Sequence, residues 1–150
     1  MTICIVDTSV VCELLDIPMM ASAPDDFRSL LHAKMEAGES LLLPMTSVIE
    51  TGNHIGQNGD GRQRRASAVR FAGFVEKAVA GQLPFAPTPL PDLEDITSLL
   101  HEFPDWAATG SGLGDLSIVK TWKHQCSLNP LRRVYIWSLD EHLSSYDHDP

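Results

Sequence analysis

The stretch Ile3-Cys4-Ile5-Val6-Asp7 places four consecutive apolar residues directly before a carboxylate. An unbroken run rich in β-branched residues is typical of a strand buried on both faces, in the middle of a parallel sheet. Ligands of open α/β sheets gather outside the carboxyl ends of the strands, and Asp7 would lie there. Taken alone, Asp7 is better explained as the cap of the helix that follows. The stretch predicts a central strand and leaves both roles open for its aspartate.

The segments that follow predict an α/β fold with a parallel sheet. A helix is expected to begin at Pro24 and to end near Gly38, and Leu41–Leu43 is a short buried strand. Strand, helix and strand form a β-α-β unit, whose crossover should be right-handed. Val134–Trp137 is another buried strand, and Asp140 follows it as Asp7 follows the first.

Prolines suggest the backbone structure of two further segments. The proline-rich segment Leu83–Pro91 suits an extended edge segment or a loop. The apolar stripe that starts at Leu93 predicts a helix, and Pro104 is expected to end it.

Composition places the chain among folded globular proteins. Its 150 residues are 43% apolar and 21% charged, and we expect one domain over residues 1–150. No apolar run is long enough to cross a bilayer, and no secretory signal is recognisable. The three cysteines (Cys4, Cys12 and Cys126) are scattered, so we expect two of them, Cys4 and Cys12, to be core residues, in a reducing cytoplasm.

The net charge of −9 counts against nucleic-acid binding through a broad basic surface. It does not exclude a nuclease whose acids are concentrated in one metal site. The acidity also favours a basic protein partner.

Two more acids stand at the starts of predicted helices. Glu50 follows Ser47 by three residues, which is the spacing of a capping box, but it could equally face Asp7. Asp115 lies in the first turn of a helix from Leu113 to Cys126, where a lone acid usually complements the helix dipole. Gly112 and Gly114, on either side of Leu113, suggest that another group approaches the backbone closely there.

Asp7, Glu50, Asp115 and Asp140 together would lie on one edge of the sheet. At a spacing of ~4–6 Å they would repel one another, and some would have to take up protons. A divalent cation removes that cost, and ligation by oxygen alone suits Mg²⁺ or Mn²⁺ better than Zn²⁺. Such ions hydrolyse phosphodiesters by activating water and stabilising charge at phosphorus.

A basic cluster follows the loop that ends at Gly61. Arg62, Arg64 and Arg65 lie on one predicted helix. They are either a solvated helix face or a patch that contacts RNA phosphates.

The ordered set of acids resembles the four motifs of PIN-domain nucleases. The matching stretches are ICIVDTS (Ile3–Ser9), LPMTSVIETGNHI with Glu50, GLGDLSIVKTW with Asp115, and VYIWSLDEHL with Asp140. Their order and spacing are most similar to the compact toxins of VapBC-type toxin–antitoxin pairs. The resemblance implies a Rossmann-like three-layer α/β/α sandwich and Mg²⁺- or Mn²⁺-dependent endoribonuclease activity. It also implies a homodimer and a cognate antitoxin that blocks the site.

By the same resemblance, the four acids would be catalytic metal ligands, and Ser9 and Ser138 would be supporting hydroxyls. The chain departs from the family with Ser138 where threonine is common and Leu143 where an aromatic residue is common. Three other functions or roles are compatible with some of these residues. A haloacid-dehalogenase-type phosphatase needs a second acid at position 9, where this chain has Ser9. A non-catalytic PIN-like module that binds RNA or protein stays open, as does an ordinary α/β domain whose four acids only cap helices.

Overall fold

The computed structural model describes residues 1–150 as an α/β fold, in which seven helices accompany a five-stranded sheet. The strands are β1 (Ile3–Val6), β2 (Ser40–Pro44), β3 (Phe85–Thr88), β4 (Val134–Trp137) and β5 (Asp147–His148). The helices are α1 (Thr8–Leu14), α2 (Pro24–Glu36), α3 (Met45–Gln57), α4 (Gly61–Val79), α5 (Leu93–Ala108), α6 (Leu113–Leu128) and α7 (Glu141–Ser144).

The sheet has the order β3-β2-β1-β4-β5, with β1 at its centre. The strands β3, β2, β1 and β4 are parallel, and β5 pairs with β4 in the antiparallel direction. In the central register, Ile5 lies between Leu42 of β2 and Ile136 of β4. Every residue of β1 is buried, as expected for a strand covered on both faces. The predicted central strand and parallel β1–β2 unit are therefore confirmed.

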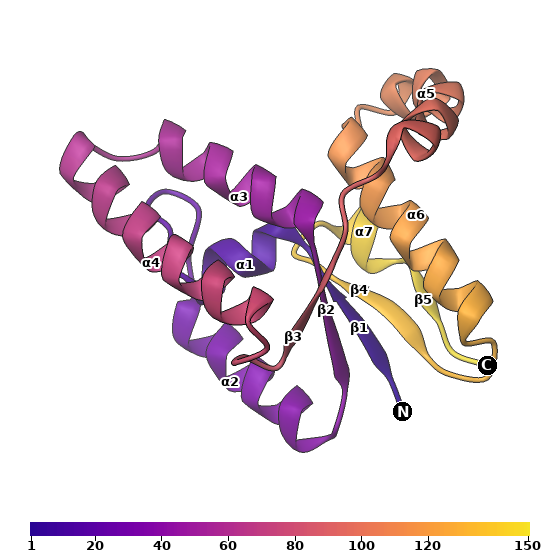
Figure 1. The fold of residues 1–150 in the computed structure, drawn as a ribbon, viewed down its shortest axis with the longest axis horizontal. Helices are drawn as coiled ribbons and strands as arrows, with labels where there is room; N and C mark the ends of the chain where they lie inside the picture. Colours follow the sequence, from indigo (N-terminus) through magenta and orange to yellow (C-terminus); the bar gives the residue numbers. More distant parts are fainter.

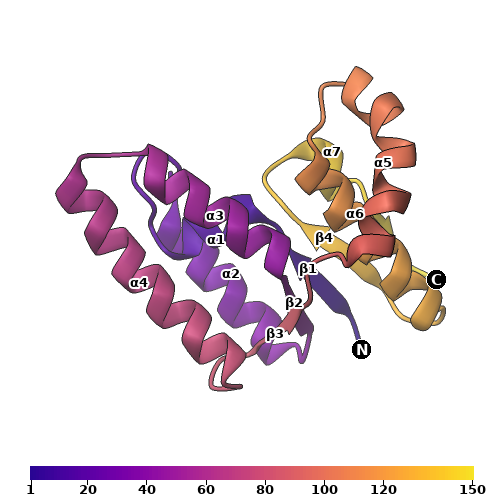
Figure 2. The same cartoon turned by 45° about the horizontal axis from the view of Figure 1, so that its top comes forward.

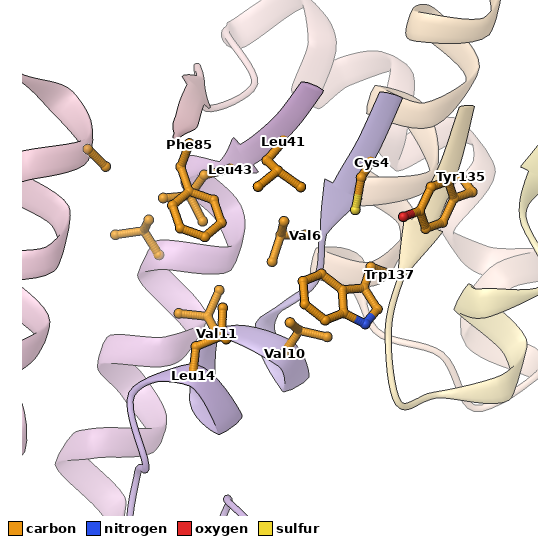
Figure 3. Packing of buried hydrophobic residues seen from close by; sticks show 12 residues of the cluster. Cys4, Val6, Val10, Val11, Leu14, Leu41, Leu43, Phe85, Tyr135 and Trp137 are labelled. Carbon is orange, nitrogen blue, oxygen red and sulfur yellow. The ribbon is translucent and has the colours of Figure 1, made fainter. Parts of the chain in front are cut away.

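Helices cover both faces of the sheet (Figures 1 and 2). On one face, alternate side chains of β1 and β2 pack with α1 in a cluster that includes Val6, Val11 and Leu43 (Figure 3). On the other face, Ile5 and Ile136 pack against Ile118 of α6. The alternation of β1 residues between the two clusters follows from the two-residue period of a strand. This arrangement is compatible with a three-layer sandwich.

Part of the proline-rich segment forms an edge strand, one of the two structures expected for it. Within Leu83–Pro91, β3 pairs with β2 alone and forms one edge of the sheet, as expected for a strand that contains Pro87.

Pro104 does not end its helix, because α5 continues to Ala108, so this prediction was wrong. Proline lacks the N–H that would bond the carbonyl of Leu100, four residues earlier, and Leu100 is an exposed residue.

Two of the three cysteines lie in the core, and the helices do not include a membrane span. Cys4 and Cys12 are fully buried and unpaired, which confirms them as small core residues. None of the seven helices combines the length and the apolar character required to cross a membrane.

Candidate functional site

The four predicted acids all follow strand ends or begin helices at one edge of the sheet. Asp7 follows β1, and Asp140 follows β4 by three residues. Glu50 lies in the second turn of α3, directly after β2, and Asp115 lies in the first turn of α6. The starts of α3, α6 and α7 gather around the carboxyl ends of β1, β2 and β4 (Figures 1 and 2). The fold thus brings together acids from four separate segments.

Asp7 is the most deeply buried of the four, with 4% of its surface exposed. Its Oδ2 atom accepts hydrogen bonds from the hydroxyls of Ser9 and Ser138, each at 2.7 Å. The Ser9 backbone N–H donates to the same oxygen at 3.4 Å, so Asp7 also caps α1 as expected. Capping and a place in the acidic group are therefore compatible roles, because one carboxylate has two oxygens.

The two serines join the ends of β1 and β4. Their hydroxyl oxygens lie 3.3 Å apart. The backbone N–H of Leu139 donates to Ser9 Oγ at 3.1 Å, and the backbone N–H of Asp140 donates to Ser138 Oγ at 3.0 Å. Ser9 and Ser138 therefore fix the position of the Asp7 carboxylate and the path of the chain toward Asp140.

Glu50 is not part of a capping box, so that interpretation was wrong. Helix α3 begins at Met45, earlier than the capping box requires, and the Ser47 hydroxyl donates to the backbone carbonyl of Val6 at 3.0 Å. Glu50 Oε2 instead accepts a hydrogen bond from the Thr8 hydroxyl at 2.9 Å. Because Thr8 directly follows Asp7, this bond ties the start of α3 to the end of β1.

Because Gly114 has no side chain, the carboxylate of Glu50 can lie against the first turn of α6. A Cβ atom at residue 114 would collide with Glu50 Oε1 and would lie 2.6 Å from Glu50 Cδ. The close approach expected at this glycine is therefore confirmed. No heavy atom lies within 4 Å of the corresponding position at Gly112.

Asp115 and Asp140 complete the group. Asp140 is exposed and caps α7, with the His142 backbone N–H donating to its Oδ1 at 2.9 Å. Burial, and after it the charges of Asp7, Glu50 and Asp140, together raise the pKa of Asp115 to about 6. The carboxylates are thus close enough to repel one another.

The donor set fits a hard divalent cation in its chemistry. Each of the four carboxylates keeps at least one oxygen that accepts no hydrogen bond, and Asp115 accepts none at all. No group of three or more acid, histidine or cysteine side chains is arranged to enclose a metal ion. The side chains present therefore supply suitable oxygen ligands, without a finished coordination sphere.

The predicted arginines lie elsewhere. Arg62, Arg64 and Arg65 are exposed in the first turns of α4. Arg64 donates a hydrogen bond to the backbone carbonyl of Gly59 at 2.5 Å. The start of α4 follows the far end of α3, whereas Glu50 lies near its beginning (Figure 1). The structure does not bring these arginines to the acids.

Two contributors to the site, Thr8 and His142, were not singled out from the sequence. Thr8 could have been found because it is a hydroxyl residue directly after the strand-end aspartate, although only the fold shows that it contacts Glu50. The His142 side chain acts electrostatically on Asp115 and partly offsets the rise in its pKa. It lies two residues after Asp140, a spacing that predicts nothing by itself.

A separate cavity of about 540 Å³ lies between the segment after β3 and one face of α6. Polar residues dominate its lining, and they include Ser117, Lys120 and His124, on the side of α6 turned away from Asp115. The buried hydroxyl of Thr88 has no hydrogen-bond partner. None of the four acids lines this cavity.

The chain was compared with models of protein families, with curated proteins and with solved structures. None of the three comparisons gives a match.

Proposed function

We propose that this chain is a Mg²⁺- or Mn²⁺-dependent endoribonuclease of the PIN type. The observation that carries the proposal is the gathering of Asp7, Glu50, Asp115 and Asp140 at one sheet edge, where three of them raise the pKa of the fourth. Helix capping explains Asp7 and Asp140 individually, but it gives no reason for Glu50 and Asp115 to face them. A shared cation does.

The four acids would hold the cation through the oxygens that accept no hydrogen bond. When bound, a divalent cation lowers the pKa of a water molecule and stabilises the charge that develops at phosphorus. The reaction would be an in-line attack of water on an RNA phosphodiester, which leaves a 5′-phosphate and a 3′-hydroxyl. The carboxylates would also repel RNA phosphates until a cation neutralises them, so RNA binding should depend on the cation.

Hydroxyl groups of the chain would position these acids. Ser9 and Ser138 hold one oxygen of Asp7 and leave the other available to a cation. Thr8 does the same for Glu50. Such supporting hydrogen bonds orient metal ligands and restrict their motion.

The PIN-like interpretation of the fold is part of the proposal. An α/β fold with four parallel strands, and with acids after β1 and β4, supports it. The similarity of the acidic motifs to those of VapBC-type toxins further suggests a toxin that acts as a homodimer and is blocked by a cognate antitoxin. The net charge of −9 favours a basic surface on such a partner.

The test is RNA cleavage by the wild-type chain and by Asp7→Asn, with Mg²⁺ and with EDTA. Asn keeps the size of the side chain and its ability to cap α1, but it removes the charge. We expect cleavage only by the wild type with Mg²⁺, with 5′-phosphate ends. Asp26→Asn, at an exposed acid in the first turn of α2, is the matched control and should cleave as the wild type does. Equal cleavage by the wild type and Asp7→Asn would exclude this mechanism.

The alternative is a non-catalytic module on the same scaffold that binds RNA or protein. The absence of a finished arrangement of three metal ligands favours it. In that case the wild type would bind a partner, and no RNA would be cleaved with Mg²⁺ or Mn²⁺.

A further inference from the structure

Four rings form a row that leads from the core to the acidic edge. The ring of Trp122 in α6 lies 5.2 Å from that of Tyr146, between ring centroids. The ring of Tyr146 lies 5.7 Å from that of His142, and His142 lies 5.1 Å from Trp106 of α5. These separations and the inclined ring planes are those of favourable aromatic pairs. The row joins α5, α6 and α7 beside the acids.

Hydrogen bonds hold the two ends of the row. The indole N–H of Trp122 donates to the Val134 carbonyl at 2.9 Å, which anchors it to β4. The indole N–H of Trp106 donates to the carbonyl of Gly112, the cap of α6, also at 2.9 Å. Since Asp115 lies three residues after Gly112, Trp106 is fixed relative to that acid. The row is therefore a preorganised part of the site's wall.

His142 is the exposed member of the row. Trp106, Trp122 and Tyr146 are only partly exposed and pack against the core. The backbone of His142 is held by Asp140, and its side chain acts electrostatically on Asp115. Core packing accounts for the other three rings, but it does not account for an exposed ring held between two others at this edge.

We propose that the His142 ring, supported by Trp106 and Tyr146, stacks against one nucleobase of single-stranded RNA beside the cleaved phosphodiester. This inference rests on the proposed ribonuclease function. Aromatic side chains bind unpaired bases by stacking, which every base permits. The ring is rigidly supported, so little side-chain entropy is lost when a base binds.

The charge distribution explains why such a contact is needed. The chain is acidic overall, and Arg62, Arg64 and Arg65 lie at the far end of α3 from the acids. Phosphate contacts at the site itself would therefore depend on the cation. Stacking adds affinity that requires no basic side chain, and it would fix which nucleotide flanks the cleaved bond.

The experiment pairs protein variants with RNAs that lack a single base. Short RNAs that are abasic at one position each around the mapped cleavage site are titrated, with Mg²⁺, against Asp7→Asn and against Asp7→Asn with His142→Ala. We expect His142→Ala to weaken binding of the intact RNA roughly 5- to 100-fold. With the RNA that is abasic at the stacked position, His142→Ala should have almost no further effect.

Two variants separate stacking from a structural role. His142→Phe keeps a ring and should retain the affinity for intact RNA. His101→Ala, at an exposed histidine of α5 outside the row, should behave as the parent does. The inference is overturned if His142→Ala weakens every abasic RNA by the same factor as intact RNA, or weakens none.

The outcome also separates this inference from the function on which it rests. If the wild-type chain cleaves RNA but the effect of His142→Ala does not depend on any base, the proposed nuclease function stands and the stacking contact is wrong. If the wild-type chain neither cleaves nor binds RNA, both the proposed ribonuclease function and the stacking contact are wrong.

Discussion

The carboxylate of Glu50 lies directly against the Cα atom of Gly114, so that a Cβ there would come within 2.6 Å of Glu50 Cδ. The obstructing group is the end of a flexible side chain, which can move without disturbing the backbone. Gly114→Ala should therefore displace the carboxylate and leave the fold intact. We expect cleavage to fall about 100-fold, the usual effect of a misplacement near 1 Å. Stability should change by no more than about 1 kcal/mol, since alanine favours helix. Cleavage kinetics and urea unfolding measure the two effects.

Gly112→Ala is the matched control for this prediction. It makes the same substitution two residues earlier, where a Cβ meets no heavy atom within 4 Å. Its cleavage rate should stay within a few-fold of the wild type. If both glycine variants lose activity equally, the loss comes from the loop before α6 and not from Glu50.

The sequence predicted the elements that carry Asp7 and Asp140 because both acids end unbroken apolar runs. Short unbroken runs rich in β-branched residues are typical of a strand covered on both faces. The start of α6 was equally recognisable from its glycines and its apolar stripe. These local patterns were enough to place all four acids at helix starts or strand ends, although they left the contacts of Glu50 open.

What the sequence could not supply were relationships that depend on tertiary contacts. Glu50 has the spacing of a capping box, but Ser47 binds the carbonyl of Val6 on β1 instead. Pro104 is locally a helix breaker, yet α5 continues through it to Ala108. The two-residue strand β5 is too short to carry any periodic pattern. For Ser47, a hydrogen bond to a distant strand outweighs the local preference for a capping box.

Asp115 should make stability depend on pH in a predictable direction. Its pKa is about 6 in the folded chain, because of burial and then the charges of the neighbouring acids, against an ordinary value of 3.8. An acid with a raised pKa favours the folded state when protonated, so this contribution is complete below about pH 4 and is lost as pH rises through 6. In EDTA, Asp115→Asn should therefore be more stable than the wild type at pH 7, by roughly 1–2 kcal/mol for a partly exposed group. Urea unfolding of both proteins at pH 4 and pH 7 measures this difference in unfolding free energy, which should vanish at pH 4.

Mg²⁺ provides an independent check on the same carboxylates. A cation that binds only the folded chain should raise the wild-type midpoint of thermal unfolding at pH 7. Asp115→Asn removes both a ligand and much of the repulsion, so its midpoint should respond less. If the same Mg²⁺ concentration stabilises both proteins equally, the ion is not held by Asp115.

Glu13 should be essential for stability and not for chemistry. It is completely buried in α1, and its carboxylate accepts hydrogen bonds at 2.9–3.1 Å from the backbone and hydroxyl of Ser22 and the backbone of Ala23. Burial by itself would raise the pKa of Glu13, but these hydrogen bonds lower it below the ordinary value. Glu13→Gln places an amide N–H against these donors and should cost about 2–4 kcal/mol at pH 7.

The pH dependence of Glu13 runs opposite to that of Asp115. A lowered pKa stabilises the fold above the ordinary pKa of glutamate, and this contribution is lost as pH falls through the lower value in the folded chain. The difference in unfolding free energy between wild type and Glu13→Gln should therefore narrow from pH 7 to pH 3. A difference that stays constant would mean that packing, and not the charge, accounts for the cost.

Ser9 and Ser138 should act on cleavage as a pair, because both hydroxyls donate to the same oxygen of Asp7. Either serine alone still holds the carboxylate, so Ser9→Ala and Ser138→Ala should each reduce cleavage by only about 3- to 10-fold. The double variant leaves Oδ2 with the long bond from the Ser9 backbone N–H, and it should lose more cleavage than the product of the two single effects. Single-turnover cleavage measures all four proteins, and Ser29→Ala, at an exposed serine of α2, is the control. Multiplicative losses would mean that the two hydroxyls act independently, so that the shared oxygen of Asp7 is not what they control.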